Sequence, residues 1–507
     1  MNEKVSKLIH QSLDLLVVGG GIVGSGVARD AAMRGLTTAV IDKLDFASGT
    51  SSRSSRLLHG GIRYLAQGRI GLVREASREK MVINRIAPHL SDPLAFIFPT
   101  HKHSTWSLWK LGIGVKIYDL LCGGRNLGKS SVLGRNRIHK LLPGLKTKKL
   151  TGAVRYFDGL TNDARLVLDT LRSASHHGAT VMNYVQFIDA QPEKDHWRCE
   201  LQNTTTRESF EIRTKCVVNA TGPWSHELPG SETSLRLTKG VHLVVERSRL
   251  PVPDAVVFAE GARILFAIPW GERVILGTTD TDYDGPIDTP LCEPEDQQYV
   301  LDVVNDAFPE VGLTNNDVIS TWAGLRPLVA DKHGKPSDIS RRHEIKMSHP
   351  GWWDVTGGKL TSYRLMAEET VDAVAGFLKT NLETCQTATT LLLERPDSLQ
   401  VSGILPPQCS QKVVEHFCRH EWAIHLDDVM IRRTSWRYYF SDHMEIANKV
   451  AGWMATCLAW SNETKNRELS RYRQITGSSN LPSPHFDQNG SCASPRDHLK
   501  QDAYSNI

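Results

Sequence analysis

The sequence predicts an α/β protein with inserted antiparallel segments and a small helical domain near its C-terminus. Three observations support this fold class. A short apolar run ends in glycines and is followed by a helical pattern, further apolar runs alternate with helical patterns, and residues 412–473 are rich in Trp, Ala, Met, His and Arg at helical spacing. The 507 residues are 40% hydrophobic and 23% charged, which excludes collagen-like, coiled-coil and wholly disordered chains.

Charge and cysteine content exclude several functional classes. The formal net charge of +4 gives no indication of a nucleic-acid partner. The nine cysteines contain no CxxC pair, so we expect neither a disulfide framework nor a metal site, and a reduced, cytosolic setting. No apolar run reaches the roughly 18 residues of a spanning helix. The first dozen residues are short and charged, and we expect neither a secretory signal nor a transit peptide.

The first forty-two residues read as a βαβ unit. Residues 13–18 form an apolar strand, residues 22–33 a helix, and residues 37–41 a second strand that ends at Asp42. The turn between the first strand and the helix has the GxGxxG pattern, formed by Gly19, Gly21 and Gly24. Such glycines let the backbone approach a pyrophosphate at a helix N-terminus, and the acidic residue after the second strand accepts hydrogen bonds from a ribose. A structural glycine-rich turn would leave Asp42 unexplained, so we predict a Rossmann-like dinucleotide-binding domain.

A loop rich in Ser, Thr, Gly and Arg follows at residues 44–65. Its hydroxyls, including those of Thr50, Ser51 and Ser55, are suited to a flavin's ribityl chain and pyrophosphate, and Gly60 and Gly61 permit backbone contact with a flat ring. The alternative is a solvated loop, which the flanking apolar and basic residues disfavour.

Further along the chain, residues 215–219 and 273–276 read as buried strands and residues 164–177 and 295–308 as helices. The predicted organisation begins with an oxidoreductase unit at 12–383. Its cofactor-binding segments lie at about 12–90, 150–230 and 320–383, and its substrate-domain segments at about 91–149 and 231–319. A linker at 384–411, an abbreviated helical domain at 412–475 and a disordered tail at 476–507 follow.

Nine blocks in order give the sequence a close resemblance to a known family. They are GGGIVGSGVARDAAMRG (19–35), TSSRSSRLLHGGIRYL (50–65), APHL (87–90), NATGPW (219–224), KGVHLVV (239–245), IPW (268–270), LGTTD (276–280), GLRPL (324–328) and GGKLTSYR (357–364). The sequence resembles the FAD-dependent, quinone-linked, aerobic-type glycerol-3-phosphate dehydrogenases. This implies an FAD-binding Rossmann-like domain of the glutathione-reductase and D-amino-acid-oxidase type, with an inserted antiparallel-sheet substrate domain and a helical C-terminal domain.

The resemblance also implies cofactor and substrate sites. Flavin contacts beyond the glycine-rich turn and the loop are expected at Leu58, His59, Ala220, Gly222, Gly358, Lys359 and Leu360. The substrate, glycerol 3-phosphate, carries nearly two negative charges and needs cations with forked donors. Its expected contacts are Arg63, Tyr64, Arg326, Arg341, Lys359 and Thr361.

Oxidation of the secondary alcohol moves a hydride to the flavin and a proton to a base poised near neutral pH. His242 in KGVHLVV is the first choice for this base, because histidine titrates in the right range and its block matches a family segment that reaches the substrate. The alternative for His242 is a buried, satisfied strand residue, and His59 is the second candidate base. Arg326 and Lys359 are expected to stabilise the developing alkoxide.

In the family, the electron acceptor is a membrane quinone reached by peripheral attachment. Residues 106–121, WSLWKLGIGVKIYDLL, are a candidate interfacial helix, with burial against a neighbouring domain as the alternative. The implied location is cytoplasmic, at the inner face of the cell membrane. Two rival functions are a glycerol-3-phosphate oxidase that uses dioxygen and a catalytically silent flavoprotein that serves as a binding module. A nicotinamide-linked dehydrogenase is disfavoured because no second dinucleotide fingerprint occurs. The type of quinone, covalent attachment of flavin and the choice between monomer and homodimer are left open.

Overall fold

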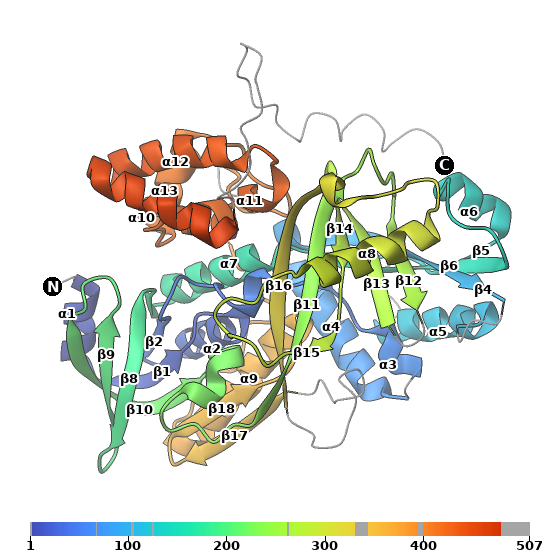
Figure 1. Cartoon of the computed structure of the whole chain (residues 1–507). Coiled ribbons are helices and arrows are strands. Elements are labelled where there is room, and N and C mark those ends of the chain that lie inside the picture. Colours follow the sequence, from blue (N-terminus) through green and yellow to red (C-terminus); the bar gives the residue numbers. More distant parts are fainter. Residues whose placement is uncertain are drawn as a thin grey trace.

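The computed structural model describes residues 3–66, 68–102, 106–123, 126–260, 263–329, 343–393 and 399–477. Two β-sheets lie side by side, and a group of C-terminal helices sits over them at the upper left of Figure 1. The mixed α/β architecture with a helical C-terminal domain agrees with the predicted fold class. The predicted disordered tail lies, beyond Gly477, outside the described residues.

The first sheet has the strand order β17-β18-β10-β1-β2-β7, and β8 and β9 extend it beside β10. Its strands are β1 (Leu13–Val18), β2 (Thr38–Ile41), β7 (Thr180–Met182), β8 (Val185–Pro192), β9 (Trp197–Asn203), β10 (Ser209–Asn219), β17 (Glu344–His349) and β18 (Trp352–Thr356). The pairs of β1 with β2 and β10, of β2 with β7 and of β10 with β18 are parallel. The apolar runs predicted at residues 13–18 and 215–219 therefore lie next to each other, as expected for strands buried on both faces.

Helices cover both faces of this sheet. One face packs against α2 (Ile22–Met33), α7 (Asp163–His176) and α9 (Tyr363–Leu378). The other packs against α1 (Glu3–His10) and the β8–β9 hairpin. The carboxyl ends of β1, β2 and β10 consequently open at one edge, where ligands bind in parallel sheets.

The second sheet is largely antiparallel, with the order β15-β11-β14-β13-β12-β4-β6-β3 and with β16 and β5 paired to β11 and β6. Its strands are β3 (Leu57–Leu58), β4 (Asp92–His101), β5 (Ser131–Leu133), β6 (Leu150–Leu160), β11 (Leu235–Glu246), β12 (Ala255–Glu260), β13 (Arg263–Trp270), β14 (Arg273–Gly277), β15 (Thr281–Asp282) and β16 (Val318–Val329). The helices beside it are α3 (Ile62–Ala66), α4 (Ile70–Ile86), α5 (Leu108–Leu121), α6 (Arg135–Leu141) and α8 (Pro294–Ala307).

The structure corrects the predicted segment boundaries at three strands. β3, β6 and most of β16 lie in segments that we assign to the cofactor domain, but β3 and β6 pair with each other, β6 pairs with β4, and β16 pairs with β11, all in the second sheet. An apolar run shows that a strand is buried without showing which sheet it joins, so the sequence pattern alone did not decide this.

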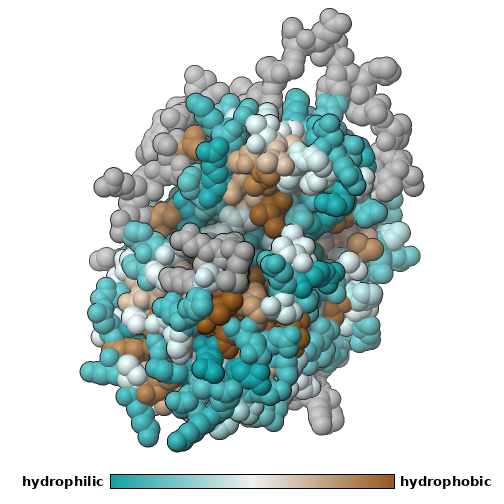
Figure 2. Space-filling model, turned by 90° about the vertical axis from the view of Figure 1, so that its left-hand side faces the viewer, coloured by the Kyte–Doolittle hydropathy of each residue, from teal (hydrophilic) through white to brown (hydrophobic). Residues whose placement is uncertain are grey.

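The C-terminal domain consists of α10 (Gln411–His420), a π-helical turn at Asp428–Arg433, α11 (Trp436–Tyr439), α12 (His443–Leu458) and α13 (Asn462–Thr476). Its apolar residues share one core with the second sheet. The predicted linker also packs against the body of the protein: Arg29 donates to the carbonyl oxygen of Thr390 at 2.8 Å, and the Leu392 amide donates to Ile86. Figure 2 shows a face of the molecule that is largely hydrophilic, with separate apolar areas.

Candidate active site

The glycine-rich turn between β1 and α2 is built for close backbone approach. Gly19 has φ +107°, and a Cβ atom there would lie 2.6 Å from the carbonyl oxygen of Ala220. A Cβ atom on Gly24 would lie 1.9 Å from the carbonyl oxygen of Gly19. At the start of α2, the Ile22 amide donates to Oγ of Ser51 at 3.0 Å. The predicted turn and the Ser-rich loop thus meet at a helix N-terminus, where the helix dipole favours phosphate.

Asp42 lies at the end of β2, as predicted. Its carboxylate accepts hydrogen bonds from the amides of Gly20 at 2.8 Å and Leu44 at 2.9 Å. Burial raises the pKa of Asp42 to about 7. Asp42 lines a cavity of about 470 Å³ together with residues of several of the sequence blocks. These residues include Gly19, Gly21, Thr50, Ser51, Ala220, Gly222, Gly358, Lys359 and Leu360.

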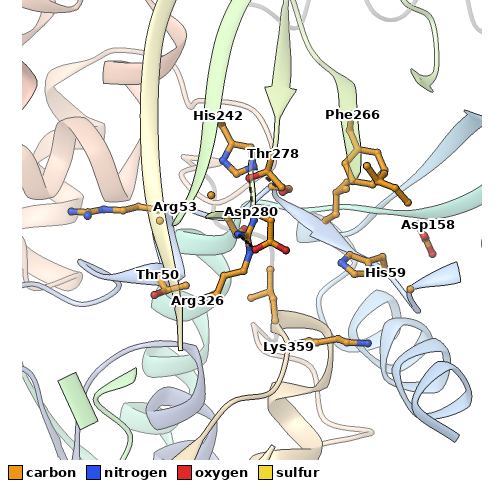
Figure 3. A pocket seen from close by; sticks show the side chains of 18 of the residues that line it. Thr50, Arg53, His59, Asp158, His242, Phe266, Thr278, Asp280, Arg326 and Lys359 are labelled. Carbon is orange, nitrogen blue, oxygen red and sulfur yellow. Dashed lines mark hydrogen bonds and ion pairs between the residues drawn. The ribbon is translucent and has the colours of Figure 1, made fainter. Parts of the chain in front are cut away.

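A second cavity, of about 600 Å³, shares the wall formed by Thr50, Ser51, Gly358, Lys359 and Leu360. Its other lining residues come mainly from the second sheet and from the loop before α3 (Figure 3). Two cavities that share a wall, with a phosphate-binding turn in the first, fit an elongated dinucleotide cofactor whose ring lies at the junction.

Arg326 projects from β16 into this second cavity. Its guanidinium donates to Oγ1 of Thr278 at 3.0 Å and lies 3.2 Å from Oδ1 of Asp280 (Figure 3). A Cβ atom at position 240 would lie 2.3 Å from Nη2 of Arg326, so Gly240 on the paired strand β11 leaves room for the guanidinium. Arg326 is therefore a held, partly buried cation at the cavity wall.

His242 lies on β11 at the same cavity. Its Nε2 is 2.8 Å from Oγ of Ser55, and its ring stacks on Trp322 with centroids 5.1 Å apart. Burial and the charges of Arg326 and Arg56 lower the pKa of His242 to about 3. The imidazole is therefore not poised near neutral pH in the protein without substrate, because burial and two neighbouring cations disfavour the charged ring. The His242 imidazole is therefore neutral near pH 7 in the protein without substrate.

Lys359 and Tyr64 meet at the shared wall. The Lys359 ammonium lies 4.1 Å from the centroid of the Tyr64 ring, within cation–π range. A Cβ atom on Gly61 would lie 2.5 Å from Tyr64, so this glycine admits the ring. Both side chains line the second cavity together with His59.

Four predicted contacts lie elsewhere or are not described. The Thr361 hydroxyl donates to the carbonyl oxygen of His59 and accepts from its amide, so it positions His59 instead of lining the cavity. Leu58 packs in a core cluster away from both cavities, because β3 pairs with β6 and turns this side chain inward. The side chain of Arg63 and all of Arg341 lie outside the described residues.

Sequence reasoning missed two parts of the second cavity. Thr278 and Asp280 hold Arg326, and both occur in the LGTTD block that we had noted without assigning a role. The other part is an apolar arm lined by Phe96, Phe98, Tyr156 and Phe266. These side chains come from three strands far apart in the chain, so no local pattern brings them together. Among the described residues there is no cluster suited to a metal ion.

The sequence is similar to known families of flavin-dependent enzymes. Residues 14–373 match the family model "FAD dependent oxidoreductase", and residues 399–465 match "C-terminal domain of alpha-glycerophosphate oxidase". The chain is 39% identical to the aerobic glycerol-3-phosphate dehydrogenase of Staphylococcus aureus over 381 residues, which cover 73% of this chain and 68% of that protein. The chain belongs to the FAD-dependent glycerol-3-phosphate dehydrogenase family.

Solved structures agree with this family membership. The glycerol-3-phosphate dehydrogenase from Bacillus halodurans, complexed with FAD, has a TM-score of 0.77 and 29% identity to this chain, and the match covers 96% of this chain and 98% of that one. The L-α-glycerophosphate oxidase of Mycoplasma pneumoniae has a TM-score of 0.59 over 75% of this chain and 98% of its own, and at 16% identity it supports the fold alone. As a member of the glycerol-3-phosphate dehydrogenase family, the chain is a flavoprotein oxidoreductase with FAD as its cofactor. The glycine-rich turn, Asp42 and the wall at residues 358–360 would hold the FAD.

Proposed function

We propose that the protein oxidises sn-glycerol 3-phosphate to dihydroxyacetone phosphate and passes the electrons to a membrane quinone. The observation that carries the proposal is the polar end of the second cavity, where Arg326, Lys359 and His242 line one space that shares a wall with the cofactor cavity. FAD, when bound, supplies the hydride acceptor. A small phosphorylated alcohol fits this end because its charge matches the two cations.

The chain's own residues have separate tasks in this reaction. Arg326 and Lys359 bind the anionic substrate and stabilise the oxygen as its proton leaves. His242 accepts that proton from the C2 hydroxyl. Burial and the charges of Arg326 and Arg56 together hold the pKa of His242 low. The two negative charges of the substrate offset these cations, so substrate binding raises the basicity of the imidazole. In this mechanism, the base becomes competent when the substrate is in place.

The apolar arm of the cavity supports a quinone as the acceptor. Phe96, Phe98, Tyr156 and Phe266 line it, and a flat, apolar ring suits such a space better than a charged carrier does. Phe98 also contacts Trp106, at 5.5 Å between centroids, next to the start of α5. Phe98 thus connects the apolar lining of the cavity to the segment that precedes α5.

The surface of α5 supports peripheral contact with a membrane. The inner side of the helix is buried, so the alternative of burial against neighbouring structure applies to that side. The outer side exposes Trp109, Ile113, Ile117 and Leu120. Together with Val132 these residues line an apolar groove, and Lys102, Lys110 and Lys116 are exposed around it. Among the described residues, no helix is long and apolar enough to cross a bilayer. We propose that α5 lies in the interface at the inner face of the cell membrane, with the protein otherwise in the cytoplasm.

Anaerobic mixing of the FAD-loaded protein with glycerol 3-phosphate tests the substrate. We expect the flavin absorbance near 450 nm to bleach within seconds, whereas a silent binding module would stay yellow. Glycerol and inorganic phosphate are the controls, and bleaching by glycerol alone would contradict the role of the cations.

The acceptor needs a separate measurement, because the match at residues 399–465 carries the name of an oxidase domain. We expect fast turnover with a soluble quinone analogue and slow oxygen consumption. Stoichiometric peroxide release at the quinone-supported rate would instead make the protein an oxidase. A homodimer stays a prediction, which light scattering of the purified protein would test.

A further inference from the structure

Arg56 is buried beside the active site and makes little use of its hydrogen-bonding capacity. Its guanidinium lies 4.3 Å from the ring centroid of Trp270 and 5.4 Å from that of Trp322. Nη2 donates to Oγ of Ser435 at 3.1 Å, and Nε is 4.0 Å from Oδ1 of Asp163. Nε and Nη1 have no hydrogen-bond partner among the described residues. Burying a cation costs desolvation free energy, so a buried arginine at this position indicates a role beyond packing.

Arg56 reaches His242 by two routes. Trp322, which the guanidinium contacts, stacks on the His242 ring with an interplanar angle of 17°. Ser55, the residue before Arg56, is the hydrogen-bond partner of His242 Nε2. The backbone of Arg56 has φ +56°, a conformation that turns the chain sharply between these two contacts. Arg56 therefore adjoins both groups that fix the imidazole: Trp322, which stacks on the face of the ring, and Ser55, which is bonded to Nε2 at its edge.

The C-terminal domain holds the far end of this arrangement. Ser435, which precedes α11, is buried and accepts from the guanidinium. Three residues on, the Tyr438 ring lies 5.0 Å from Trp322, and its carbonyl oxygen accepts from Oγ of Ser320 on β16. A continuous set of contacts thus runs from the C-terminal domain through Arg56 and Trp322 to the imidazole.

We propose that Arg56 is a positioning residue for His242, and that the C-terminal domain fixes Arg56 through Ser435. Arg56 acts by holding Trp322 and Ser55 around the imidazole. The charged and titratable groups near His242 are Arg326 on β16, Arg56 on the loop before β3, and Asp163 on α7 and Tyr438 on α11 behind Arg56. The inference rests on the proposed function, in which His242 takes the substrate proton.

A double-mutant cycle tests the role of Arg56 in the FAD-loaded protein. We expect Arg56→Met to slow anaerobic flavin bleaching by glycerol 3-phosphate about 10²-fold, the loss that a misplaced catalytic group can cause. Arg56→Lys should keep most of the rate, since an ammonium can still lie over the rings. In a His242→Gln background, Arg56→Met should have no further effect. Additive losses, or wild-type bleaching by Arg56→Met, would overturn the proposal.

The contact from the C-terminal domain has a matched control. Ser435→Ala should slow bleaching by about tenfold, the loss of one hydrogen bond to a charged group. Ser402→Ala removes a hydroxyl that donates to Asp169 at 2.5 Å and does not touch Arg56, so its rate should stay at the wild-type value. Equal rates for the two variants would rule out the link through Ser435.

A readout without substrate separates this inference from the proposed function. The ¹⁵N chemical shifts of the His242 ring, assigned with His242→Gln, report its hydrogen bonds and protonation. We expect Arg56→Met to move them and Arg56→Lys to leave them in place. If glycerol 3-phosphate fails to bleach the wild-type flavin, the proposed function is wrong and the ring shifts alone decide this inference. Unchanged shifts in Arg56→Met would refute it.

Discussion

Ser55 Oγ lies 2.8 Å from Nε2 of His242, so the Ser-rich loop that approaches the cofactor also holds the candidate base. We had assigned Ser55 to the flavin alone. Its contact with His242 joins the cofactor loop to the strand β11 of the second sheet. A displacement of the loop is therefore expected to affect proton transfer as well as cofactor binding.

The first prediction concerns His242 itself. His242→Gln keeps a polar side chain of similar reach but cannot accept the proton, so flavin bleaching by glycerol 3-phosphate should slow by about 10²–10⁴-fold. The amount of bound FAD should not change. Rapid-mixing absorbance at saturating substrate measures the rate. Bleaching within a factor of two of the wild type would mean that another group takes the proton.

Arg326 is expected to act mainly in substrate binding. Arg326→Ala should weaken substrate binding by about 1.5–3 kcal/mol, the usual contribution of a hydrogen bond to a charged group, without loss of FAD. Arg326→Lys is the matched control. It keeps the charge but loses the forked donors, so its substrate affinity should lie between those of the wild type and Arg326→Ala. A titration of the bleaching rate against substrate concentration measures the effect. An unchanged half-saturation value in Arg326→Ala would place the phosphate elsewhere.

FAD affinity should depend on pH through Asp42. Burial raises its pKa to about 7, so the carboxyl is protonated below that pH in the protein without cofactor. Ribose hydroxyls donate to the ionised form, so FAD binding should release a proton, and the affinity should rise with pH up to about 7, by up to about tenfold per unit. Fluorescence titration of cofactor-free protein between pH 5 and 8 measures this, and Asp42→Asn should remove the slope. A wild-type affinity that falls as the pH rises would contradict this assignment.

Membrane association should depend on α5. Leu120 is 72% exposed on this helix, and Leu291 is 67% exposed away from the groove. Leu120→Glu should abolish flotation with liposomes that contain anionic lipid, whereas Leu291→Glu should float as the wild type does. Bleaching by glycerol 3-phosphate should be the same in all three proteins. Equal flotation of the two variants would exclude α5 as the attachment site.

Asp45 should matter for stability. It is buried and pairs with Arg432 and Arg433 of the C-terminal domain. Asp45→Asn removes the carboxylate that pairs with the buried Arg433, and the loss should lower the free energy of unfolding in urea by about 3–5 kcal/mol. Arg432 keeps its pairs with Asp427 and Asp428. The exposed pair of Asp288 with Lys43 is the control, and Asp288→Asn should cost less than about 1 kcal/mol. Similar losses in both variants would show that the buried pairing contributes little.

Local patterns predicted the parts of the site that are continuous in sequence. The strand, the glycine turn and Asp42 lie within thirty residues of one another, so spacing alone places them together. Family blocks then placed Lys359 and Arg326 at the second cavity. The contacts of Arg326 could not be predicted from the sequence, because Gly240 and Thr278 approach it only through the pairing of β11 with its neighbours.

The sequence predicted less well where burial changes the chemistry. His242 looked like a base near neutral pH, but its low pKa results from burial and from Arg326 and Arg56, which approach it from other segments of the chain. The sequence indicated no specific role for Arg56, since its contacts with Trp270 and Trp322 span more than 200 residues. Such long-range contacts leave no periodic trace in a single sequence.

The order of strands in the first sheet has a consequence for biosynthesis. β1 pairs with β10, and β10 pairs with β18, which ends at Thr356. A ribosome must therefore translate about two thirds of the polypeptide before the strands that carry the cofactor cavity can pair. Flavin loading is a late event in the life of the nascent chain, and apolar strand edges stay exposed to chaperones until then.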